Sequence, residues 1–261
     1  MNIHIGLPGL FPKLLESFSK TDFAKAHSVE VLSTVAWQRH FLPFINSKKD
    51  LLQDLSLRAQ AEDALEELSD RAEFIISQHD LLGSPEGCFF KDRLLPFTEA
   101  RITRLVDLFE DRPLEFHVII TNQVDYFRLT IEPFIEKMNN AAALQIPSWS
   151  SLVERIQSAA PNVGIHVWDF ERPDLIAGQF MMGILEQADS RFADEINAHL
   201  VARLNSIPVV QDDPETRFLP QDLEERLDLQ YERDLEILSD LDGIILKLGD
   251  DARHPAWVSS I

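Results

Sequence analysis

The sequence contains almost no cysteine: Cys88 is the only one in 261 residues. An intramolecular disulfide and a zinc site built from several cysteines are therefore excluded. No uninterrupted apolar run approaches the roughly 20 residues that cross a bilayer. The N-terminal segment has neither the charged region nor the long apolar region of a secretory signal. We therefore expect a cytoplasmic protein that has no membrane span.

Basic residues are also scarce. The chain carries 24 Lys and Arg against 44 Asp and Glu, which gives a formal net charge of −20. A field of this sign repels nucleic acid and anionic membranes, so we expect neither as a partner. An anionic ligand would need a site that is locally basic against this background. The simplest role of the charge is solubility.

The chain does contain short apolar runs that alternate with longer segments of helical period. Strands are predicted over residues 3–6, 29–35, 72–77, 115–121 and 164–169. Helices are predicted over residues 13–26, 46–69, 98–109, 124–142, 148–159, 173–187, 191–205 and 223–241. Repeated strand–helix units predict an α/β fold, a three-layer sandwich with a central, mainly parallel sheet. We expect one domain over residues 1–261, with an acidic helical extension from about residue 190.

Several local features follow from the same pattern. In the helix over 46–69, a buried stripe is predicted from Leu51, Leu52, Leu55, Leu65 and Leu68. Thr98 is predicted to cap the helix that follows it, and Ser148 or Ser150 the helix over 148–159. Proline cannot donate to the helical ladder, so Pro133 is expected to bend the helix over 124–142. The acidic residues after Pro214 are expected to form a solvated face.

The first strand leads into the turn Gly6-Leu7-Pro8-Gly9, and Lys13 opens an amphipathic helix. A strand, a Gly/Pro turn and a helix are how a P-loop begins, with backbone N–H groups and the helix N-terminus collecting phosphate. The second glycine of a working P-loop, the Lys beside it and the following Ser/Thr are missing. Phe11 and Pro12 instead fill the space where small residues let the backbone approach phosphate, and Pro12 has no N–H to offer.

Four segments occur along the chain in the order Gly6-Leu7-Pro8, Ser77-Gln78-His79-Asp80-Leu81, Val167-Trp168-Asp169-Phe170-Glu171 and Tyr231-x-x-Asp234. In this order they resemble the bacterial sulfotransferase family, a branch of the P-loop fold. The family loop reads Gly-Leu-Pro-Lys-Thr-Gly-Thr-Thr, and its second segment is of the type Ser-Ser-Glu-Asp-Leu. The resemblance implies a P-loop sheet and the donor 3′-phosphoadenosine 5′-phosphosulfate.

The segment after the strand over 115–121 is similar to the family only in part. The family has Arg-x-x-x-Asp there, with a Ser eight residues after the Arg, to hold the 3′-phosphate of the donor. Gln123 and Asp125 fit this pattern, but Thr121 stands at the Arg position and Leu129 at the Ser position. Losing a loop Lys and this Arg would remove about 3–6 kcal/mol of charge-assisted bonding, or two to four orders of magnitude in affinity.

We therefore expect a sulfotransferase-like protein with an eroded donor site. It would be a non-catalytic or divergent protein that binds an unknown small molecule or protein, with no cofactor. The alternative is an active sulfotransferase that moves a sulfuryl group to a hydroxyl acceptor through a rearranged site. Whether the chain is an enzyme stays open at this point, and a third interpretation is an unrelated α/β enzyme whose Gly6-Leu7-Pro8 match is accidental.

In the active alternative, His79 is the candidate general base and Asp80 would orient its ring. The donor, 3′-phosphoadenosine 5′-phosphosulfate, would then be the cofactor. Its candidate ligands are Gly6, Pro8, Gly9, Lys13, Asp125 and Arg128. Asp169, Glu171 and Arg172 could line the same cleft, or cap a helix or form ion pairs instead. His4 and His117 lie inside strands and are predicted to be core or strand-end residues. No two histidines have the i, i+4 spacing of a helical zinc site, so no metal is expected.

Overall fold

The fold is described from a computed structural model. It describes residues 2–5, 19–20, 22, 25, 30–47, 51–69, 74–77, 81–82, 89–90, 93–130, 148–171, 179–180, 183–184, 219 and 221–248. The helices predicted over 13–26, 173–187 and 191–205 lie wholly or mostly outside these residues, and so does Pro133.

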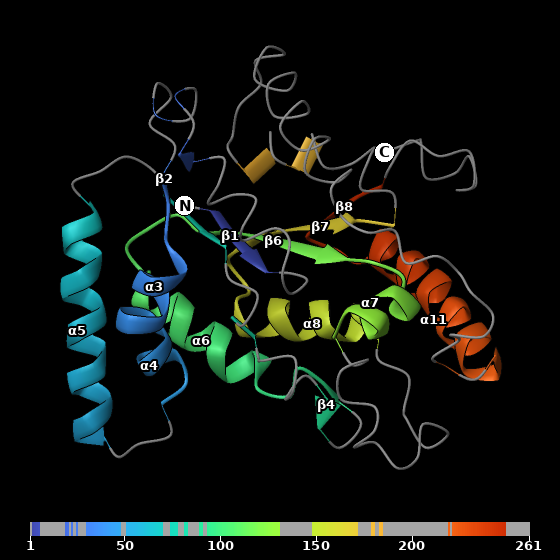
Figure 1. Ribbon diagram of the computed structural model, residues 1–261, viewed down its shortest axis with the longest axis horizontal. Coiled ribbons are helices and arrows are strands. Elements are labelled where there is room, and N and C mark those ends of the chain that lie inside the picture. Colours follow the sequence, from blue (N-terminus) through green and yellow to red (C-terminus); the bar gives the residue numbers. More distant parts are fainter. Residues whose placement is uncertain are drawn as a thin grey trace.

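A six-stranded sheet forms the centre of the molecule (Figure 1). Its strands are β1 (Asn2–Ile5), β2 (Glu30–Val31), β3 (Phe74–Ser77), β6 (Glu115–Ile120), β7 (Gly164–Asp169) and β8 (Ile244–Lys247). They lie in the order β2-β3-β1-β6-β7-β8, and every neighbouring pair is parallel. The prediction of an α/β fold with a parallel sheet is therefore confirmed.

Strand β1 lies in the middle of the sheet, between β3 and β6. After β1 the chain moves to the β2–β3 side, and it then crosses to β6 and continues outward through β7 to β8. The connections that leave the carboxyl ends of β1 and β6 therefore run to opposite sides. In open α/β sheets, ligands bind in the crevice at such a switch point. The segment after β1 begins at Gly6, and the segment after β6 begins at Thr121.

The described helices have the following bounds: α3 (Thr34–Ala36), a π-helical turn η1 (Trp37–Phe41), α4 (Leu42–Ile45), α5 (Leu51–Ser69), α6 (Thr98–Leu108), α7 (Gln123–Thr130), α8 (Trp149–Ala159) and α11 (Gln221–Asp240). An antiparallel pair, β4 (Phe89–Phe90) and β5 (Arg93–Leu94), lies between β3 and α6 in the chain. Figure 1 shows α6, α7, α8 and α11 together along the same side of the sheet.

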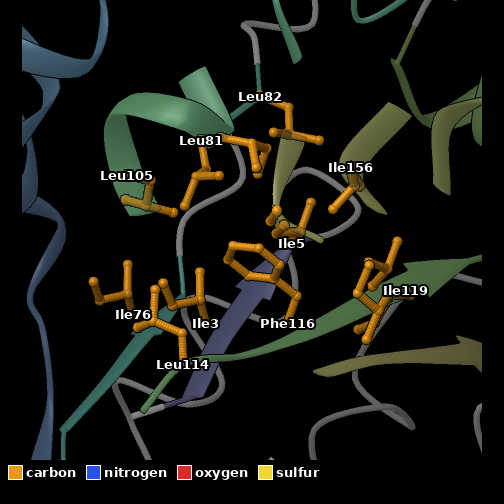
Figure 2. Packing of buried hydrophobic residues seen from close by; sticks show 14 of the residues in the cluster. Ile3, Ile5, Ile76, Leu81, Leu82, Leu105, Leu114, Phe116, Ile119 and Ile156 are labelled. Carbon is orange, nitrogen blue, oxygen red and sulfur yellow. The ribbon is translucent and has the colours of Figure 1, made fainter. Parts of the chain in front are cut away.

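The sheet face toward these helices is apolar. Ile3 and Ile165 are the register partners of Phe116, and all three side chains are buried. Figure 2 shows the Phe116 ring beside Ile5 in this core, with Leu105 of α6 and Ile156 of α8 in the same cluster. Because both faces of a parallel sheet are covered, its strands are expected to be almost continuously apolar.

The opposite face departs from that expectation, because it carries polar and aromatic side chains. His4, His117 and Trp168 share this face, and the buried ring of Phe180 meets each of them edge-on at centroid distances of 5.3, 6.4 and 5.5 Å. Phe180 thus covers the face from the far side of the sheet, where Figure 1 shows the short helical pieces around residues 179–184. The prediction that His4 and His117 are core histidines is confirmed.

Two predicted local features are wrong. In α5, Leu52 and Leu55 are 78% and 53% exposed, although Leu65 is buried as predicted. This helix packs against its neighbours through Leu57, Ala64 and Leu65. The side chains of Leu51 and Leu68 lie outside the described part of the chain. The strand predicted over 29–35 ends at Val31, because the Ser33 side chain accepts the Ala36 N–H and starts a helix there.

The helix caps are also partly corrected. Ser148 caps α8 by accepting the Ser151 N–H, as predicted. Thr98, by contrast, is already the first residue of α6, and Phe97 takes the cap position. The Thr98 hydroxyl donates backward to the Leu95 carbonyl at 2.7 Å instead of accepting an N–H. Leu95 has a φ of +49°, a left-handed conformation that L residues rarely adopt.

A helical segment that the sequence pattern did not predict runs from Thr34 to Ile45. It consists of α3, the π-helical turn η1 and α4. Leu42 donates its N–H to the Trp37 carbonyl, five residues earlier. The next residue, Pro43, has no N–H and could not bond to the carbonyl four residues before it. The wider π turn accommodates this missing donor, and Trp37 and Phe41 pack inward from it.

The C-terminal region is not only a helical extension. Helix α11 matches the prediction over 223–241 closely, but the chain then forms β8, which was not predicted and which pairs with β7. The turn between them uses Gly243 at a φ of +79°, a conformation that glycine adopts without strain. Helix α11 is therefore part of the crossover connection from β7 to the parallel strand β8.

Candidate functional site

The predicted donor-binding and catalytic residues are only partly within the described chain. Gly6, Pro8, Gly9, Lys13 and His79 lie outside it. Arg128 lies in α7, but its side chain is outside the described part. Asp125 lies in the first turn of α7 and is exposed. Of the predicted set, the structure thus places the side chain of Asp125 alone, at the carboxyl edge of the sheet.

A hydrogen-bond network occupies that edge beside β6 and β7, and we call it the carboxyl-edge network. It comprises Asn122, Gln123, Ser148, Trp149, Ser150, Asp169, Asp228, Gln230, Tyr231 and Asp234. Its centre is the carboxylate of Asp234 on α11, which is 0% exposed. The donors to this carboxylate are Gln123 Nε2 at 2.9 Å, Ser148 Oγ at 2.8 Å, Trp149 N at 2.7 Å, Ser150 Oγ at 2.7 Å and Gln230 Nε2 at 3.0 Å.

A second contact of the network joins Tyr231 to the end of β7. The Tyr231 hydroxyl donates to Asp169 Oδ1, and both side chains are buried. The same Asp169 oxygen accepts the Glu171 N–H at 2.9 Å. Burial, and the nearby carboxylates of Asp169, Glu171 and Asp125, raise the pKa of Tyr231 well above its usual value. The phenol therefore stays protonated at neutral pH and acts as a donor.

A third contact links α11 to the segment after β6. Asn122 Nδ2 donates to Asp228 Oδ1 at 2.8 Å, while Asn122 Oδ1 accepts the Val124 N–H at 2.8 Å. The residue before it, Thr121, is buried, and its carbonyl accepts the Trp149 indole N–H at 2.8 Å. Thr121, Asn122 and Gln123 are therefore each bonded to α8 or α11.

The Tyr231–Asp169 contact gives a stability prediction. Tyr231→Phe removes a donor from a buried carboxylate, so we expect the free energy of unfolding to fall by about 1–3 kcal/mol. Urea unfolding of Tyr231→Phe, Asp169→Ala and the double variant measures the coupling, which we expect to be about 1–2 kcal/mol. The control pair combines Tyr231→Phe with Asp54→Ala, because Asp54 lies on α5 and bonds to Arg104, so the two losses should add. Additive losses in the Tyr231/Asp169 pair as well would contradict the contact.

Sequence reasoning treated α11 as a solvated acidic helix and so missed the role of Asp234. A signal was present, because Leu223, Leu227, Tyr231, Asp234 and Leu238 follow one another at intervals of three or four residues and are all buried. An acidic residue on such a stripe predicts a buried carboxylate with partners. Asp169 was predicted to line a cleft, to cap a helix or to form an ion pair, and the structure shows its carboxylate bonded to the Tyr231 hydroxyl and the Glu171 N–H.

The polar face opposite the helices contains a second group of bonded side chains. His117 Nε2 lies 3.1 Å from Asn2 Oδ1, and Trp168 Nε1 donates to His117 Nδ1 at 3.2 Å. An indole nitrogen is a donor only, so Nδ1 of His117 accepts and Nε2 carries the proton. The His117 and His166 rings stack at 5.0 Å, and His4 Nδ1 lies 2.7 Å from Ser77 Oγ. Burial lowers the pKa of His4 and of His117 to about 3, so both are neutral at pH 7.

These arrangements limit the chemistry available at the described edge. The donors around Asp234 are already bonded to a carboxylate, and further carboxylates stand beside them in Asp125, Asp169, Glu171 and Asp228. The negative charge of these carboxylates repels an incoming anion. Within the described residues, no group of three or more His, Cys, Asp or Glu side chains is arranged to hold a metal ion. Within the same residues, no helix is both long enough and apolar enough to cross a membrane.

Comparison with models of protein families, with curated proteins and with solved structures found no match to the chain.

Proposed function

We propose that the chain is a sulfotransferase-like α/β protein whose site for 3′-phosphoadenosine 5′-phosphosulfate no longer forms, and that it works as a non-catalytic binding protein. The parallel sheet supports the proposal, since β1 lies at its switch point and is followed in the sequence by Gly6-Leu7-Pro8. The proposed ligand is a small molecule or a protein segment that does not depend on an anion site between β6 and α8.

The observation that carries the proposal is the segment directly after β6. In the family pattern, the Arg that holds the 3′-phosphate would stand at position 121. Thr121 is only 4% exposed, and its carbonyl accepts the Trp149 indole N–H. Gln123 is bonded to Asp234 and Asn122 to Asp228. The segment therefore offers uncharged groups, and those of Asn122 and Gln123 are already engaged with carboxylates of α11.

The residues at this edge do not fit the donor, which is a polyanion. Each lost bond from Lys or Arg to a phosphate costs roughly 1.5–3 kcal/mol. The carboxylates of Asp125, Asp169 and Glu171, which already act on the Tyr231 phenol, add repulsion at the same edge. We therefore expect no sulfuryl transfer at this edge of the sheet.

Isothermal titration with 3′-phosphoadenosine 5′-phosphate tests the proposal. We expect no binding at micromolar concentrations, since the lost cations correspond to about two to four orders of magnitude in affinity. Submicromolar binding would overturn the proposal. If the wild type does bind, the same titration of Lys13→Ala and Arg128→Ala is the matched control. Loss of submicromolar binding in both variants would then favour the active alternative. Transfer of radiolabelled sulfate to hydroxyl acceptors, with His79→Ala as the comparison, would then test the proposed base.

A further inference from the structure

The N-terminus of α8 is occupied by a carboxylate of the chain itself. Asp234 accepts the Trp149 N–H from the first turn of α8, and it accepts the hydroxyls of Ser148 and Ser150 on either side of it. Gln123, at the start of α7, and Gln230, one turn earlier on α11, add their amide N–H groups. Asp234 therefore bridges three helices from a fully buried position.

All five of these donors are uncharged. Burying a carboxylate without a cation partner is costly unless hydrogen bonds satisfy its oxygens. Here the compensation comes from the backbone N–H and the dipole at the helix start, together with hydroxyl and amide donors. This is the combination that holds free anions at helix N-termini in proteins. The Asp234 carboxylate occupies the position that a small anion would take.

Two further side chains of α11 make polar contacts with the carboxyl edge, besides Asp234. Asp228 bonds to Asn122 after β6, and Tyr231 bonds to Asp169 at the end of β7. The three side chains follow at intervals of three residues, so they lie on neighbouring positions of the helix surface. The fully buried Leu227 and Leu238 lie along the same stripe.

We propose that Asp234 is a built-in anion, which closes α11 onto the N-terminus of α8 and excludes external anions from the edge of the sheet. The inference deepens the proposed function and rests on it in one respect, that no external anion is the ligand at this edge. It adds that the Asp234 carboxylate is the group that keeps external anions out of this edge. Removing the carboxylate, while leaving its donors in place, should open a site for a small free anion.

Formate is the probe, since it supplies the carboxylate that Asp234→Ala removes. We expect Asp234→Ala to lower the melting temperature by roughly 10 °C in sodium chloride, because five donors lose their acceptor. Replacing 200 mM chloride by 200 mM formate should raise the melting temperature of this variant by roughly 3 °C more than that of the wild type. A gain in Asp234→Ala no larger than the wild-type gain overturns the proposal.

Asp228→Ala is the matched control, because it removes a carboxylate from the same helix that is exposed and bonded to one side chain. We expect its formate response to equal that of the wild type, and an equal response in both variants would contradict a specific site. If Asp234→Ala does not fold in chloride, the readout is soluble protein after refolding. More folded protein in formate than in chloride supports the proposal, and equal yields overturn it.

Asp234→Asn keeps the shape of the side chain but removes its charge, so it separates the effects of the two. An amide in this position brings its own N–H groups against the donors, and it fills the space that formate would need. We expect this variant to lose stability and to gain no more from formate than the wild type, and a selective gain would contradict the proposal. None of these outcomes depends on titration with adenosine bisphosphate, so the two proposals can fail separately.

Discussion

Acidification from pH 7 to pH 4 should lower the free energy of unfolding by about 6 kcal/mol through His4 and His117 alone. Burial lowers the pKa of each from 6.5 to about 3. Between these values the unfolded chain binds a proton that the folded chain excludes. The stability that the two neutral histidines contribute is therefore complete above pH 6.5 and is lost as the pH falls through the window from 6.5 to 3.

The measurement is a series of urea unfolding curves between pH 4 and pH 7.5. His4→Asn and His117→Asn place a side chain that does not titrate at each position, so each should reduce the pH dependence by about 3 kcal/mol over this range. His40→Asn is the matched control, because His40 lies on the π turn and is only partly buried. A pH dependence that is the same in all three variants would contradict the assignment to the buried pair.

Carboxylates with a lowered pKa also make the folded state less stable on acidification, but at lower pH than the two histidines. The hydrogen bond from Arg104 lowers the pKa of Asp54 below 3.8, so its contribution is present above that value and is lost only as the pH falls further. Asp54 is near the surface, and solvent screens this ion pair. Restricting the series to pH 4 and above keeps the histidine effect separate from that of Asp54.

The largest loss from a single truncation is expected at Phe116. Phe116→Ala removes a ring that is 0% exposed in the middle of β6, between register partners Ile3 and Ile165 (Figure 2). We expect a fall of about 3–5 kcal/mol in the free energy of unfolding, because rigid strand neighbours cannot close the cavity. This is a large part of the 5–15 kcal/mol that stabilises a typical domain.

Phe97→Ala is the matched control for this substitution. The chemical change is the same, but Phe97 is 46% exposed at the start of α6. We expect a loss of less than about 1 kcal/mol, measured by urea unfolding at pH 7.5. Comparable losses at the two positions would contradict the placement of Phe116 in the core.

The long strands and the well-capped helices could be predicted because their signals are local. Strand β7 matches the predicted range over 164–169, and the cap of α8 is Ser148, one of the two serines predicted for it. Strand β8 was missed because four residues after an acidic helix carry too little pattern, and the pairing with β7 decides their conformation. The exposure of Leu52 and Leu55 likewise depends on how α5 is placed against its neighbours.

The candidate site shows the same division. The sequence indicated that Gln123, Asp169, Tyr231 and Asp234 belong to one family-like pattern, and the structure brings them together at the carboxyl edge. Their partners could not be predicted, because the acidic composition of α11 favours a solvated helix when the sequence is taken alone. The predicted ligand Asp125 is exposed, and its carboxylate raises the pKa of Tyr231 together with those of Asp169 and Glu171.

The sequence by itself determined that this chain folds as a parallel α/β protein, because apolar runs and helical periods are set by neighbouring residues. It also determined that residues 6–12, which follow β1, contain no Lys or Arg. Only the tertiary structure decided that Asp234 is buried and bonded. A carboxylate is stable in the interior only where several donors converge, and those on α7 and α8 come from residues 84 to 111 positions away in the chain.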